Sequence, residues 1–153
     1  MKMIDENSKT IAIDFDGTIV EHAYPDIGIE MLFAFETLKA LQEKGHILIL
    51  WTFRYGKELD EAVEFCRQKG IEFYAVNKNY PEEEWNNDIS RKIQADIFID
   101  DRNIGGFQGW SKVWQMLHPE GGDFNHQLED PLAHTNYPKS ITFWDKLLLL
   151  FKK

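Results

Sequence analysis

The chain has 153 residues, of which 43% are hydrophobic and 28% charged, a composition typical of one globular domain with a buried core. Its formal net charge of −9 argues against a nucleic-acid partner, because displacing counterions from phosphates requires a basic surface. The apolar run at residues 147–151 is too short to span a bilayer, and the first residues lack the apolar stretch of a signal peptide. We therefore expect a cytoplasmic protein without a membrane span.

Apolar runs alternate with helical patterns along residues 10–105. Residues 11–15 predict a first strand, and residues 29–44 predict a helix with apolar side chains at helical spacing. Further strands are predicted at 46–51, 71–76 and 97–99, with a helix at 57–69 and a polar, irregular loop at 77–87. This order predicts an α/β fold, a Rossmann-like parallel sheet with helices on both faces. Cys66 lies in line with apolar residues of its helix, which predicts a buried thiol rather than a nucleophile.

Residues 106–153 are predicted to extend the core without forming a second domain, so that residues 1–153 are one domain. Residues 111–117 predict a short helix, and residues 140–153 predict a final helix with more apolar side chains than one helix face accommodates. Packing of this helix on the sheet, burial between two copies of the chain, and contact with a membrane surface are the alternatives. A homo-oligomer is therefore one predicted arrangement.

Acidic residues follow the first and the fourth predicted strand. Asp14 and Asp16 end the first strand, and Asp100 and Asp101 end the fourth. Side chains two residues apart share a face of an extended chain, so Asp14 and Asp16 are expected to lie close together. Close carboxylates repel unless they bind a divalent cation or divide acid and base roles, although Asp16 alone could also cap the turn. The four aspartates predict a Mg²⁺ site at the edge where parallel strands end.

Thr52 directly follows the second predicted strand and offers a hydroxyl donor at this same edge. Together, these motifs resemble those of the haloacid dehalogenase-like (HAD) superfamily, in the same order and over residues 10–105. The sequence Asp-Phe-Asp-Gly-Thr at 14–18 is similar to its first motif, residues 50–52 to its second, and residues 97–101 to its fourth. The resemblance implies a Mg²⁺-dependent phosphomonoester hydrolase that acts on a small phosphorylated metabolite.

The same resemblance implies roles for individual residues. Asp14 is expected to attack phosphorus and form an aspartyl-phosphate, and Asp16 to protonate the leaving oxygen and later activate water. A cation that neutralises the transferring group is also implied, for which Lys78, Arg91 and Lys92 are the alternatives. Lys92 is preferred, because it precedes the paired aspartates at a spacing similar to that in the deoxyribonucleotidases. The predicted catalytic residues are therefore Asp14, Asp16, Thr52 and Lys92.

Predicted substrate contacts lie near the strand ends and in the polar loop. They are Phe53, Arg54, Tyr80 and Trp85, of which Arg54 could hold an anionic group in a fork of hydrogen bonds. The segments between the motifs leave no room for a cap domain, so the site is expected to be open. A 5′-nucleotidase and a phosphotransferase are alternative functions. A non-enzymatic phosphate- or protein-binding domain is disfavoured, because it would be expected to lack at least one of the reactive groups.

Overall fold

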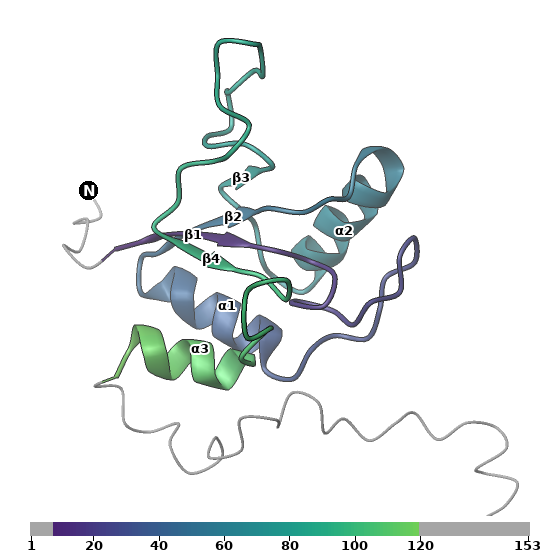
Figure 1. Cartoon of the computed structure of the whole chain (residues 1–153). Coiled ribbons are helices and arrows are strands. Elements are labelled where there is room, and N and C mark those ends of the chain that lie inside the picture. The colour runs from purple at the N-terminus through teal and green to yellow at the C-terminus, as the bar shows by residue number, and fades with distance from the viewer. Residues whose placement is uncertain (1–7, 120–153) are drawn as a thin grey trace, which may run out of the picture.

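The computed structural model describes residues 8–119, and its elements alternate between strands and helices (Figure 1). The predicted final helix at 140–153 lies outside the described residues. In chain order the elements are β1 (Thr10–Ile13), α1 (Ala34–Glu43), β2 (Ile47–Leu50), α2 (Gly56–Gln68), β3 (Ala75–Val76), β4 (Ile97–Ile99) and α3 (Trp110–Leu117).

The four strands form one parallel sheet in the order β3-β2-β1-β4. In the central pair, Thr10 of β1 is opposite Ile47 of β2, and Ile13 is opposite Leu50. The strands consist almost entirely of apolar residues, as expected where both faces of a parallel sheet are covered. The predicted α/β fold with a parallel sheet is therefore confirmed, and all four strands end at the same edge.

The two faces of the sheet are covered differently. Side chains of β1 alternate, so that Ile11 and Ile13 join the larger apolar cluster and Ala12 joins a smaller one on the opposite face. All three described helices contribute to the larger cluster, and Figure 1 shows α1 and α3 next to each other beneath the sheet. The smaller cluster is completed by Ile93 and Ala95, which belong to the segment between β3 and β4.

The prediction of helices on both faces is therefore wrong for the described part of the chain. The connection from β3 to β4, residues 77–96, contains neither a helix nor a strand. It carries Pro81 and the polar run at 86–88, residues that favour turns over a continuous helix. An irregular segment thus covers this face, and it includes the polar, irregular loop predicted at 77–87.

The first helix begins later than predicted, at Ala34 instead of residue 29. Residues 19–31 form a paired loop instead: Glu21 N donates to Ile29 O, and Met31 N donates to Ile19 O, both over 2.8 Å. Phe33 then has a left-handed backbone conformation with φ of 61°, which separates the loop from the helix. This loop, which follows β1, reaches the edge of the sheet where the strands end.

No cap domain is inserted between the strands within residues 8–119, where single helices and irregular segments make the connections. Nor is any helix in this range long and apolar enough to cross a membrane.

Candidate functional site

The carboxyl ends of the strands share one pocket, with a volume of about 670 Å³. Asp14 follows β1, Asp100 follows β4, and Thr52 and Asn77 follow β2 and β3. All four residues line the pocket. The location agrees with the general rule that parallel α/β sheets bind ligands beyond the carboxyl ends of their strands.

Three carboxylates form an acidic cluster at this edge: Asp14, Asp100 and Asp101. Each offers an oxygen, and these oxygens all lie within 4.8 Å of one another. The pKa of Asp14 is raised to about 7, chiefly by burial and also by the charges of Asp100, Asp101 and Asp16, although a hydrogen bond from the backbone of Phe15 opposes the shift. Oδ1 of Asp101 is buried without a hydrogen-bond partner. A hard divalent cation matches this set of oxygens, because it would pair the unpartnered atom and offset the repulsion.

The loop after β1 holds Asp101 in place. The backbone N–H of Asp101 donates to Oγ1 of buried Thr18 over 3.1 Å, and Oδ2 of Asp101 lies 2.7 Å from Nε2 of His22. Gly17 has φ of 84°, and a Cβ there would lie 2.5 Å from Oδ2 of Asp101 and closer still to the His22 ring. Glycine is thus required at position 17 both by the backbone conformation and by the close approach of the His22–Asp101 pair.

Asp16 is turned away from the acidic cluster and toward Arg54. Nε and Nη2 of Arg54 donate to the two carboxylate oxygens of Asp16, each over 2.7 Å. Nη1 and Nη2 also donate to the backbone oxygens of Pro25 and Asp26, over 3.0 and 2.7 Å. Arg54 is only 1% exposed, and its pKa is raised, chiefly by the hydrogen bonds to Asp16. With four hydrogen bonds inside the protein, Arg54 is placed to fix Asp16 rather than to grip a substrate.

Thr52 has its backbone and its side chain oriented by neighbours. Its N–H donates to Oδ1 of Asn77 over 2.8 Å, and its Oγ1 accepts the N–H of Arg54 over 3.2 Å. Since the oxygen accepts at this contact, its hydroxyl hydrogen remains available to a ligand in the pocket. Phe53, the next residue and one of the predicted substrate contacts, lines the same pocket.

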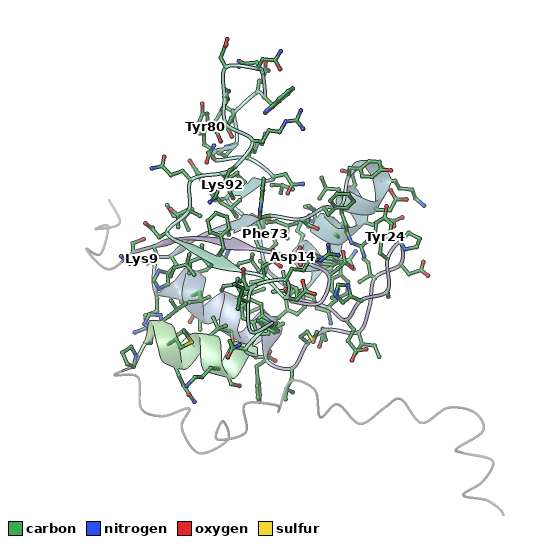
Figure 2. The ribbon with its side chains drawn as sticks, in the orientation of Figure 1. Lys9, Asp14, Tyr24, Phe73, Tyr80 and Lys92 are labelled. Carbon is green, nitrogen blue, oxygen red and sulfur yellow. The ribbon has the colours of Figure 1, made fainter. Side chains whose placement is uncertain are left out.

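The other predicted site residues do not line the pocket. The ammonium group of Lys92 lies 5.7 Å from the centre of the Phe98 ring, and that of Lys78 donates to the backbone oxygen of Pro81. Trp85 stacks instead with Arg91, whose guanidinium carbon lies 4.5 Å from its ring centre. In Figure 2, Tyr80 lies on the segment that projects away from the sheet, apart from Asp14 near the centre of the view and Tyr24 at the right.

Sequence reasoning assigned no role to several residues that shape the pocket. Asn77 orients Thr52 and has φ of 52°, a conformation that asparagine adopts more readily than most residues. Tyr24 and Arg102 line the pocket without belonging to a predicted motif, and Trp51, which also lines it, lies within the second predicted motif. Asn77 had one signal, its position directly after the third predicted strand, at the edge where the other polar residues gather.

Comparison with known proteins finds a relative of known structure. No family model matches the chain, and no curated protein matches it. A solved structure, described as that of a conserved protein from Bacteroides thetaiotaomicron, is 58% identical to it. The match covers 73% of this chain and 91% of that one, with a TM-score of 0.70. The chain therefore belongs to the same family as this conserved Bacteroides protein.

Proposed function

We propose that the protein is a Mg²⁺-dependent phosphomonoester hydrolase that acts through an aspartyl-phosphate on Asp14. The observation that carries the proposal is the pocket itself: a partly buried carboxylate, Asp14, shares it with a second carboxylate, Asp100, and with the hydroxyl of Thr52. The resemblance of the strand-end motifs to the HAD superfamily agrees with this chemistry. The open pocket also fits an enzyme that works without a cap domain.

The cation would be held by Asp14, Asp100 and Asp101, whose oxygens lie within 4.8 Å of one another. When bound, it would neutralise charge on the carboxylates and on the phosphoryl group. Asp14 then attacks phosphorus as its anion, which this neutralisation favours over the protonated form. Thr52 donates its hydroxyl hydrogen to a phosphoryl oxygen, since its oxygen already accepts the Arg54 N–H.

Asp16 moves the proton in both steps. As an acid, Asp16 gives its proton to the leaving oxygen while the bond from Asp14 to phosphorus forms and the bond to that oxygen breaks. As a base, it takes a proton from the water that attacks phosphorus, which breaks the bond to Asp14 and releases phosphate. Both of its oxygens accept hydrogen bonds from Arg54, but each retains a second lone pair that can carry this proton. Arg54 thereby holds the acid/base group in position through the two steps.

A further cation is expected to face the transferring group. Lys92 is the choice from the sequence, with Lys78 as its alternative, whereas Arg102 is the cationic side chain that lines the pocket besides Arg54. Alanine variants of the three residues rank them. Loss of a preorganised charge contact costs roughly a hundredfold or more in turnover, and loss of a solvated surface charge costs little.

A panel of phosphate monoesters tests the proposal, assayed with Mg²⁺ and after exhaustive chelation. We expect turnover only with the metal, none in Asp14→Asn, and a decrease of about two to four orders of magnitude in Asp16→Asn. Asp60→Asn, which changes an exposed carboxylate on α2, is the matched control. Activity that survives chelation, or near-normal turnover by Asp14→Asn, contradicts the proposal. An added alcohol acceptor that became phosphorylated would identify a phosphotransferase instead.

A further inference from the structure

The pocket that contains Asp14 has two chemically different parts. Its carboxylates come from the ends of the strands, whereas its rim is aromatic. The aromatic rim consists of Tyr24, in the loop after β1, and Trp51, Phe53 and Tyr55, between β2 and α2. A volume of about 670 Å³ falls in the range of sites that hold drug-sized ligands, so the pocket has room for more than a phosphoryl group.

The aromatic rim is unusually exposed for large side chains. Phe53 is 93% exposed, Tyr55 68% and Tyr24 51%. Single exposed apolar side chains are ordinary on a protein surface, but a group of them around one pocket marks a binding surface. Because Phe53 is almost fully exposed and lines the pocket, its ring is free to contact a ligand there.

Tyr24 is held in place before any ligand arrives. The guanidinium carbon of Arg54 lies 5.3 Å from the centre of the Tyr24 ring and 4.9 Å from that of Phe15, so Arg54 contacts both rings. Arg54 also binds the backbone oxygens of Pro25 and Asp26, the two residues after Tyr24. This anchoring lowers the entropy cost of ordering the rim around a ligand.

We propose that the substrate is a phosphate monoester whose leaving alcohol carries a planar aromatic ring, which stacks on the aromatic rim. The inference rests on the proposed function and adds the substrate class. Aromatic faces favour one another over saturated rings of similar size, because stacked or edge-to-face rings gain energy beyond the burial of their area. Tyr80 and Trp85, the aromatic contacts expected from the sequence, do not line this pocket.

A matched pair of ligands tests the proposal without requiring catalysis. Benzylphosphonate and cyclohexylmethylphosphonate differ only in whether the ring is planar and aromatic, and their P–C bond cannot be hydrolysed as an ester. Calorimetric titration of the protein in Mg²⁺ should give a dissociation constant about fivefold lower for the benzyl compound. The corresponding esters, benzyl and cyclohexylmethyl phosphate, release similar primary alcohols, and we expect the same preference in kcat/KM.

Two variants locate the preference. Phe53→Leu keeps an apolar side chain at an exposed position and removes the ring, so the benzyl preference should fall toward equality. Tyr74→Leu also removes an exposed ring, 49% exposed, but Tyr74 does not line the pocket, and the preference should persist. A Phe53→Leu variant with an undiminished preference overturns the proposal.

The outcomes separate this inference from the proposed function. Tighter binding of benzylphosphonate without turnover of either ester supports the aromatic site and contradicts the proposed phosphatase activity. Turnover of both esters with equal kcat/KM supports the phosphatase and overturns the aromatic preference. Equal affinities for the two phosphonates, or no binding of either, also overturn the inference.

Discussion

The acidic cluster should destabilise the protein in the absence of a divalent cation, and replacing Asp14 by asparagine should relieve this. In the folded protein the pKa of Asp14 is about 7, against an ordinary value of 3.8. A group whose pKa is raised on folding binds its proton more tightly in the folded state. The stability that this tighter proton binding contributes to the folded state is therefore fully present below about pH 4 and is lost as the pH rises to about 7.

The magnitude follows from the size of the shift. About three pKa units at 1.36 kcal/mol each correspond to roughly 4 kcal/mol, and partial exposure of Asp14 to water reduces this to an expected 2 kcal/mol or more. The amide introduced by Asp14→Asn carries no charge, so this variant should be more stable than the wild type at pH 8 by about that amount. At pH 4, where Asp14 is protonated, the two proteins should be nearly equal in stability.

Urea denaturation in chelator at pH 4 and pH 8 measures the difference, with the exposed Asp60→Asn as control. Mg²⁺ at pH 8 should then stabilise the wild type more than Asp14→Asn, because the cation binds the folded state through the carboxylate that the variant lacks. A variant that is less stable than the wild type at pH 8 without metal would refute the reasoning. So would a stability difference that does not change with pH.

Two other substitutions have matched controls in the chain. Arg54→Lys removes the fork of hydrogen bonds to Asp16 from a buried site and should lower the free energy of unfolding, measured by urea denaturation, by about 3 kcal/mol. Arg67→Lys breaks a similar fork to Glu64, but this arginine is 59% exposed, so the free energy of unfolding should fall far less. Gly17→Ala should lower both the melting temperature and the affinity for Mg²⁺, because its Cβ would displace Asp101. Gly56→Ala also places an alanine at a positive φ, of 54°, but no atom lies within 4 Å of the added Cβ. This control should leave the Mg²⁺ affinity, measured by calorimetric titration, unchanged. Equal losses within either pair would contradict the assigned contacts.

The sheet and the acidic strand ends were predictable because their signals are local. An apolar run followed by Asp or Thr indicates where a buried strand leaves the core, and this rule placed Asp14, Thr52 and Asp100 at one edge. The fourth strand was predicted at its observed bounds, residues 97–99. Parallel pairing then follows from the alternation of strands and connections, without knowledge of any side-chain contact.

The partners of these residues depend on the tertiary fold and leave no local signal. The sequence shows an arginine two residues after Thr52, but not that its guanidinium turns inward to Asp16 and away from a substrate. The loop after β1 replaces the first turn of the predicted helix because its backbone pairs across residues 19–31, a contact that helical spacing does not reveal. Likewise, the placement of Lys92 depends on the irregular path of residues 77–96.

Trapping the intermediate tests the central claim most directly. Wild type and Asp16→Asn are mixed with p-nitrophenyl phosphate and Mg²⁺, quenched in acid, reduced with borohydride, which converts an acyl phosphate to homoserine, and digested for mass spectrometry. The account predicts homoserine at position 14, enriched in Asp16→Asn because that variant lacks the base that hydrolyses the intermediate. Metal-dependent turnover with an unmodified Asp14, or with the modification on another residue, would contradict it.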